Sequence, residues 1–423
     1  MTGLYFRLSL MREAAPLASE SDRYLGLALD AHILELYANA VATLVAKSGK
    51  PYFIDPVLYR LTSTFFPEFK DKRWADNLLD LYALRDFISQ DSGGLSEDAL
   101  GLVPMTGKII PPAVDATKLA QSVLDYQRNR VPGLGAAAAV WDALEEQAGP
   151  VLHPLDFKPP EFLVAPYFFI DGPSALAVNR HLAEIAVKLR KEGERIFGEM
   201  AIGRDNLTAA VSKKRLVDSY GGVGLDGLLL WVSDFREWTE DSDYLEAFAQ
   251  FVQELKQSEP ARPVYNLFGG YFSAVLTARG LLDASVQGVG ISESRDAFAY
   301  GGGGVKRYYI PVSRQSVGTD VADDLQQVRP DLMACGCGEC APALLPSKMS
   351  IVALARHLII SRVAEYDFAL KASLPSTIQE LRDGKTKLDQ VKSANSGLFR
   401  AHGRRLEVWA AVLEKLAANG VVR

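Results

Sequence analysis

Residues 263–291 read PVYNLFGGYFSAVLTARGLLDASVQGVGI. An apolar run at Val264–Phe268 precedes a helical pattern at Tyr271–Leu282, and a second apolar run follows at Ala284–Ile291. Short runs rich in β-branched and aromatic residues predict buried strands, and a helix between two of them predicts a parallel β–α–β unit. We therefore expect an α/β protein built on a parallel sheet.

The same alternation extends along the chain on both sides of this unit. Eight candidate strands occur, at Tyr5–Leu10, Tyr52–Asp55, Phe162–Ile170, Ile196–Ile202, Gly227–Val232, Val264–Phe268, Ala284–Ile291 and Arg307–Val312. Helical patterns separate most of them, at Leu29–Lys47, Ala175–Glu192, Ala209–Tyr220, Tyr244–Lys256 and Tyr271–Leu282. Eight such units favour a closed (β/α)8 TIM barrel over an open doubly wound sheet.

Two regions interrupt this rhythm and define the expected domain organisation. Residues 1–330 are expected to form the barrel, with a helical insertion at about 56–161 after the second predicted strand. An insertion that long after a barrel strand usually covers the catalytic face. Residues 331–423 are expected to form a zinc-binding motif and C-terminal helices at Lys348–Leu370, Ile378–Leu388 and Leu398–Ala418.

Composition and charge limit the class of protein. The 423 residues are 48% hydrophobic and 23% charged, and no apolar run approaches the roughly 18 residues of a membrane span. With no signal-peptide pattern either, we expect a cytoplasmic protein without membrane contact. The net charge of −6 argues against a protein that coats nucleic acid, but residues 347–423 carry +6 and the rest −12. This bias indicates where a polyanion would bind, unless it is a chance feature of a solvated helical face.

The three cysteines of the chain form one motif, Cys335-Gly-Cys337-Gly-Glu-Cys340. This spacing folds three thiolates around one point, and the intervening glycines permit the positive φ values of such a knuckle. His357, inside the helical pattern Met349–Leu370, is the fourth candidate ligand. Four protein ligands leave no open position for water, so we expect a structural Zn²⁺.

A barrel followed by this cysteine motif and a helix-borne histidine resembles the tRNA-guanine transglycosylase superfamily. Further stretches resemble the same superfamily in order along the chain. They are Lys50–Asp55 (KPYFID), Gly227–Val232 (GLLLWV), Pro263–Gly270 (PVYNLFGG) and the helix Ala355–Leu370.

The resemblance implies a reaction that breaks the glycosidic bond of guanine and installs a 7-deazaguanine base in nucleic acid. Such an exchange needs one carboxylate as nucleophile and another as acid and base. Asp55 stands where the superfamily has its acid/base aspartate. Ser285, Val286 or Gln287 stands where it has the nucleophilic aspartate, so we expect Glu293, just past that strand, as the substitute. A salt bridge between Glu293 and Arg295 is the alternative role.

Polar residues at strand ends are the candidates for base binding, because barrel chemistry takes place at the carboxyl ends of the strands. Ser233 and Asp234 end one strand, and a carboxylate there can accept hydrogen bonds from a purine edge. The further candidates are Asp171, Arg204, Asp205, Asn266 and Arg295.

Several alternatives remain for the partners. The added helices and the departures from the tRNA-type motifs resemble the DNA-modifying branch, so DNA is favoured over tRNA. The chain is otherwise a catalytically silent subunit that pairs with a paralogue, or an enzyme acting on a small nucleoside substrate. The superfamily tends to dimerise through the zinc region, so a homodimer or heterodimer is expected.

Overall fold

The computed structural model describes residues 2–61, 73–82, 115–135, 157–289, 294–297, 306–340 and 344–422. Its centre is an eight-stranded parallel sheet with the strand order β3-β2-β1-β8-β7-β6-β5-β4. The strands are β1 Gly3–Leu8, β2 Gly26–Asp30, β3 Tyr52–Asp55, β4 Leu163–Val164, β5 Ile196–Gly203, β6 Gly227–Ser233, β7 Val264–Gly269 and β8 Ala284–Gly288.

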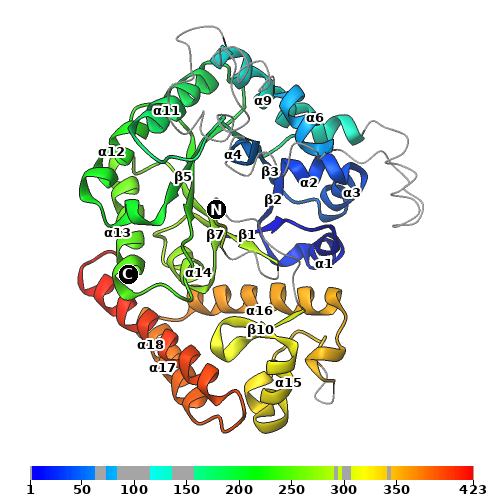
Figure 1. Ribbon diagram of the computed structural model, residues 1–423, viewed down its shortest axis with the longest axis vertical. Helices are drawn as coiled ribbons and strands as arrows, with labels where there is room; N and C mark the ends of the chain where they lie inside the picture. Colours follow the sequence, from blue (N-terminus) through cyan, green and yellow to red (C-terminus); the bar gives the residue numbers. More distant parts are fainter. Residues whose placement is uncertain are drawn as a thin grey trace, which may run out of the picture.

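The two edge strands of this sheet, β3 and β4, meet side by side. The Glu161 backbone N–H donates to the Tyr52 carbonyl at 2.7 Å, and the rings of Phe53 and Phe162 stack 4.7 Å apart. The sheet therefore curls into a nearly closed barrel with helices around it (Figure 1). This confirms the predicted α/β barrel.

One barrel strand was missed and one predicted barrel strand was wrong. Gly26–Asp30 forms β2, whereas the sequence predicted no strand there and a helix beginning at Leu29. Arg307–Ile310 forms β9, which pairs antiparallel with β10 (Gln315–Gly318) outside the barrel. Asp55 consequently ends the third barrel strand, and Ala284–Gly288 is the eighth. The predicted strand Phe162–Ile170 is regular only at β4, with one further bridge between Ile170 and Ile202.

Helices pack around the barrel. They are α1 Ala14–Ser19, α2 Ala31–Leu36, α3 Ala38–Ser48, α4 Leu58–Leu61, α6 Arg73–Leu81, α9 Asp115–Gly135, α11 Pro173–Lys188, α12 Ala210–Tyr220, α13 Ser242–Ser258 and α14 Tyr271–Ala278. In the insertion, α9 packs between α3 and α11 and so takes the place of the helix between β3 and β4. The predicted helix Ala136–Gln147 lies outside the described residues.

Inward-facing side chains fill the barrel in two layers of different character. The lower layer is aromatic, and its rings lie 3.8–6.1 Å apart between centroids: Tyr5, Phe53, Phe162, Phe197 and Tyr265. The second layer lies further along the same strands and is polar. It contains Arg7 on β1, Asp55 on β3 and Glu199 on β5. The polar layer lies towards the carboxyl ends of the strands, where barrel enzymes carry their chemistry.

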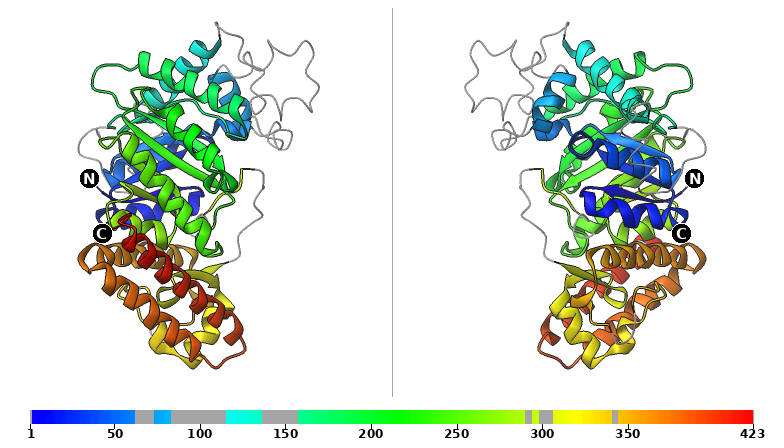
Figure 2. Two further views of the ribbon diagram at one scale, coloured as in Figure 1. Left: turned by 90° about the vertical axis from the view of Figure 1, so that its left-hand side faces the viewer. Right: turned by 90° about the vertical axis from the view of Figure 1, so that its right-hand side faces the viewer.

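The C-terminal part forms a lower lobe beside the barrel (Figure 2). It contains the β9–β10 hairpin, α15 (Thr319–Val328), α16 (Ile351–Lys371), α17 (Leu374–Asp389) and α18 (Ser396–Ala418). Helix α16 packs against α1, α14 and β1, so it completes the helical ring between the last and first barrel units. Within the described ranges, no helix has the length and apolar character of a membrane span.

Candidate active site and metal centre

The predicted metal ligands lie together. One ligand atom from each of Cys335, Cys337, Cys340 and His357 falls within 4.8 Å of all the others. The His357 Nδ1 atom lies 3.3 Å from the sulfur of Cys335 and 3.4 Å from the other two sulfurs. Gly338 adopts a φ of 73°, the left-handed conformation expected in the knuckle. These four residues can bind a metal ion.

The surroundings of His357 orient it for this role. Its Nε2 atom lies 2.6 Å from the Tyr309 carbonyl, which accepts a hydrogen bond from the N–H group there and leaves Nδ1 free to face the sulfurs. The Tyr308 ring stacks on the imidazole at 4.3 Å, and its hydroxyl lies 3.2 Å from the Cys340 sulfur. The four residues join the cysteine loop to α16.

A second group of functional side chains centres on Arg7 in the polar layer. Asp30 and Asp55 are register partners at the carboxyl ends of β2 and β3. The same Arg7 nitrogen, Nη1, contacts Asp30 Oδ1 and donates to Asp55 Oδ2 at 2.9 Å. Asp30 is 0% and Asp55 1% exposed, so two carboxylates are held side by side away from water. The guanidinium offsets their repulsion.

Asp55 is fixed from two further directions. The Tyr167 hydroxyl donates to Asp55 Oδ1 at 2.7 Å, and the Val57 backbone N–H donates to the same oxygen at 2.9 Å. Val57 reaches this position with a φ of 49°. A β-branched residue in the left-handed region is strained, and such strain is concentrated at functional sites.

Arg295, in the segment after β8, covers Asp30. It donates to Asp30 Oδ2 at 2.8 Å and to the Tyr59 hydroxyl at 3.1 Å, and its guanidinium lies 4.6 Å from the Phe268 ring centre. Burial by itself would raise the pKa of Asp30, but the charges of Arg295 and Arg7 outweigh it and lower that pKa. Asp30 is therefore an ionised carboxylate at neutral pH.

Glu199 has the opposite environment. It is buried, and neither of its carboxylate oxygens has a hydrogen-bond partner of normal geometry among the described residues. Burial, and then the nearby charge of Asp55, raise the pKa of Glu199 well above its usual range. A carboxyl group with a raised pKa thus lies in the same layer as Asp30, whose pKa is lowered. Neighbouring carboxyl groups whose pKa values are shifted in opposite directions are typical of acid–base sites.

The remaining predicted residues are spread over the rim of the barrel and its outer face. The Ser233 hydroxyl accepts from the Ala297 backbone N–H at 2.8 Å, next to Arg295. Asn266 instead donates to Ser273 of α14 at 2.8 Å, between the sheet and the helices, so the structure does not bring it into the polar layer. Four others are surface or partly exposed residues beyond strand ends: Asp171, Arg204, Asp205 and Asp234. Glu293 lies outside the described residues, and its role stays a prediction.

Sequence reasoning missed three central residues: Arg7, Asp30 and Glu199. Each is the one charged residue in an otherwise apolar strand: GLYFRL, GLALD and IFGEMAIG. Because a buried unpaired charge is costly, a lone charge in such a run is a usable signal of a site. In β8, Val286 belongs to the barrel core, while Gln287 donates to the Ser285 hydroxyl and the Gly270 carbonyl.

Comparisons with known proteins add no family. The chain matches no family model, no curated protein and no solved structure.

Proposed function

We propose that the protein is a glycosyltransferase that exchanges guanine for a 7-deazaguanine base in nucleic acid. The observation that supports this most is the grouping of two carboxyl groups, Asp30 and Asp55, at the carboxyl ends of β2 and β3 with Glu199 of β5, whose pKa is raised. Base exchange needs such a set, with one carboxylate to carry the sugar and one acid to carry the proton.

The proposed reaction has two displacements. First, a carboxylate oxygen of the pair bonds to the anomeric carbon while the carbon–nitrogen bond to guanine breaks, and Glu199 gives its proton to the departing base. The nitrogen of the incoming base then bonds to the same carbon, the ester bond breaks, and the proton of that nitrogen returns to Glu199. Asp55, expected from the sequence as the acid and base, becomes in this scheme a candidate nucleophile with Asp30.

Aromatic side chains beside the polar layer suit a flat base. The rings of Tyr59 and Trp231 have centroids 4.4 Å apart, and those of Trp231 and Phe268 are 5.6 Å apart. The Trp231 indole N–H donates to the Arg295 carbonyl at 3.1 Å, and this hydrogen bond fixes the orientation of the Trp231 ring. A nucleotide swung out of its stack, at a cost of a few kcal/mol, would exchange its neighbouring bases for these rings.

Nucleic acid as the substrate is supported by the charge of the C-terminal helices. The end of α17, the turn after it and the first half of α18 carry four exposed cations without an ion pair to any described residue: Lys387, Lys392, Arg400 and Arg404. DNA is favoured over tRNA on the resemblance alone. For the metal centre we propose Zn²⁺, because three thiolates and one imidazole form a donor set typical of structural zinc.

The test is incorporation of radiolabelled guanine into double-stranded DNA, single-stranded DNA and bulk tRNA. Wild type is compared with Glu199→Gln, Asp55→Asn, Glu293→Gln and a control, Lys188→Gln, on the outer helix α11. The proposal expects label in one polymer, lost in the Glu199 and Asp55 variants and kept in the control. Activity kept in Glu199→Gln would contradict the proposal. Activity lost in Glu293→Gln would indicate that Glu293, as expected from the sequence, is the nucleophile.

A catalytically silent partner subunit is the second candidate. It is favoured by Val286 in the core of β8 and by the full burial of Asp30 and Asp55, with Arg295 bound to Asp30. A silent subunit would incorporate no label alone and would co-purify with an active paralogue. Label exchanged only with free guanosine would instead indicate a nucleoside enzyme.

A further inference from the structure

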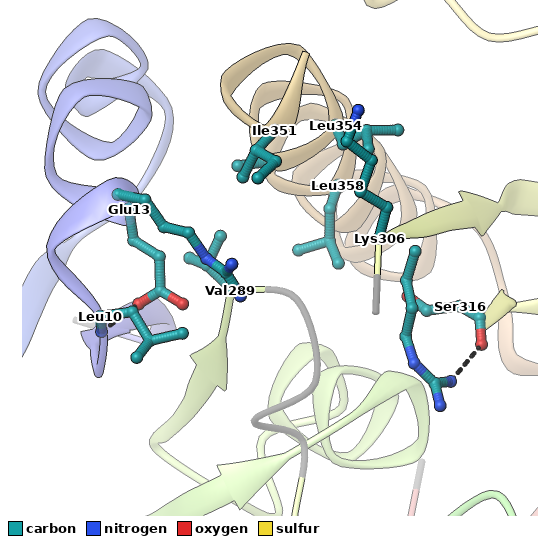
Figure 3. Close-up of a pocket in the computed structure, with 11 residues that line it drawn as sticks. Leu10, Glu13, Val289, Lys306, Ser316, Ile351, Leu354 and Leu358 are labelled. Carbon is teal, nitrogen blue, oxygen red and sulfur yellow. Dashed lines mark hydrogen bonds between the residues drawn. The ribbon is translucent and has the colours of Figure 1, made fainter. Parts of the chain in front are cut away.

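A pocket lies between the barrel and the metal-bearing helix (Figure 3). Its walls come from η1 (Met11–Glu13) with the preceding Leu10, from Val289 after β8, from the β9–β10 hairpin and from α16. Its volume of about 60 Å³ is room for roughly four or five water molecules. A small ring or a phosphate group is thus within its capacity.

One wall of the pocket is apolar. Ile351, Leu354 and Leu358 project from one face of α16, and Ile351 and Leu358 point towards Glu13 and Val289. Ile351 is 38% exposed, so this apolar face is open to a ligand at the mouth of the pocket. The wall is also fixed in place, because Leu354 and Leu358 flank the metal ligand His357 on the same helix.

The rim of the pocket is cationic. Arg12, Lys306 and Arg307 are exposed, and no ion pair is given for any of them in the described part of the chain. Lys306 donates to the Met349 carbonyl at 3.3 Å and Arg307 to the Ser316 carbonyl at 3.1 Å. These neutral partners hold the two cations at the pocket without cancelling their charge.

The one acid in the lining does little to offset these cations. Glu13 is buried, and its Oε2 atom accepts from the backbone N–H groups of Ser9 and Leu10 at 2.9 and 3.0 Å. Burial raises the pKa of Glu13 to about 7 despite these two bonds. At neutral pH and below, the pocket therefore carries a net positive charge beside an apolar wall.

The pocket lies at the same end of the barrel as the polar layer. β1 and β8 are paired neighbours, and η1 and Val289 follow their carboxyl ends. The Asp30 charge also contributes to the raised pKa of Glu13, which places the two carboxyl groups within electrostatic reach of each other. A strand whose target nucleotide enters the polar layer could therefore extend into this pocket.

We infer that the pocket binds a nucleotide, with its base against the apolar face of α16 and its phosphate among Arg12, Lys306 and Arg307. This inference rests on the proposed function and names a subsite for a nucleotide that neighbours the target. The shared chemistry, a phosphate joined to a flat ring, is also that of a free nucleotide.

The experiment compares two substitutions that add the same charge one residue apart. Ile351→Glu places a carboxylate in the pocket, whereas Val352→Glu, at 41% exposure, places one outside its lining. Both positions are in the first turn of α16, where an acidic residue favours the helix, so both variants should fold. Binding is measured by polarisation of a fluorescent single-stranded DNA, with guanosine monophosphate and inorganic phosphate as competitors.

The expected result is about tenfold weaker DNA binding for Ile351→Glu and less than about twofold for Val352→Glu. Competition by the monophosphate at the same concentration as the strand would identify a free nucleotide as the ligand. Equal effects of the two substitutions, or none, would overturn the inference. Binding is read separately from base exchange, so failure of the proposed function would appear as intact binding without label incorporation.

Discussion

At the residue scale, the carboxyl groups of the polar layer differ in what compensates for their removal from water. Asp30 and Asp55 are buried with cationic partners, because Arg7 contacts both and Arg295 pairs with Asp30. Glu199 forms no ion pair with any described residue, and burial raises its pKa well above the usual range. The strain at Val57 adds to this cost. An arrangement that costs stability points to a role other than folding.

This difference predicts opposite effects on stability for two conservative substitutions. Glu199→Gln replaces a neutral acid with a neutral amide, so the free energy of unfolding should change by less than about 1 kcal/mol. Asp55→Asn removes a counter-charge from a buried guanidinium and should cost about 3 kcal/mol. Urea unfolding at pH 7 measures both values. Equal losses in the two variants would mean that Glu199 is ionised, contrary to its assigned role.

At the element scale, local spacing was enough for the metal centre but not for every strand. The four ligands follow from a motif of six residues and a helical histidine, and the structure brings all four together. The β2 strand was hidden because GLALD is short and continues directly into the helix AHILEL. Arg307–Ile310 was correctly predicted to be a strand. Its pairing with β10 depends on the turn between the two strands, and the pattern of apolar residues does not predict that turn.

Helix α16 links the metal to the barrel, and this link predicts a local effect of metal loss. Cys340→Ala should lower the zinc content from one ion per chain to none and speed hydrogen exchange in α16 and the β9–β10 hairpin, while β5–β7 stay protected. Val352→Gln, at an exposed position of α16, is the matched control and should retain the metal. Metal retained by the Cys340 variant would refute the assigned ligand set.

At the scale of the whole molecule, barrel closure brings together residues that are distant in the sequence. Arg7, Asp55, Glu199 and Arg295 come from separate βα units, and only the register of the closed sheet places them in one layer. Sequence patterns indicated which end of each strand would be reactive. They did not give the register, so Asp55 was found while its neighbours Arg7 and Asp30 were not.

The stability of the whole molecule should fall in mild acid because of a buried histidine. Burial lowers the pKa of His402, on α18, from 6.5 to about 4, and its Nδ1 atom has no partner among the residues described. A depressed pKa contributes stability that is present above pH 6.5 and lost as the pH falls through about 4. The loss attributable to His402 should reach about 3 kcal/mol.

His402→Leu tests this expectation, because leucine fills the site without a titrating group. Thermal unfolding between pH 7 and 4 should show a smaller loss of stability for the variant than for wild type. His181→Leu, an exposed site on α11, is the control and should follow wild type. Parallel curves for all three proteins would show that His402 takes up a proton as readily in the folded as in the unfolded chain, contrary to the lowered pKa.

The most direct test of the central claim is mass spectrometry of the denatured protein after incubation with its nucleic-acid substrate and no incoming base. The account predicts an adduct of protein and oligonucleotide that survives denaturation, maps to the peptide with Asp30 or Asp55 and disappears when guanine is added. Base exchange without any adduct, or an adduct on a peptide that holds neither aspartate, would contradict it.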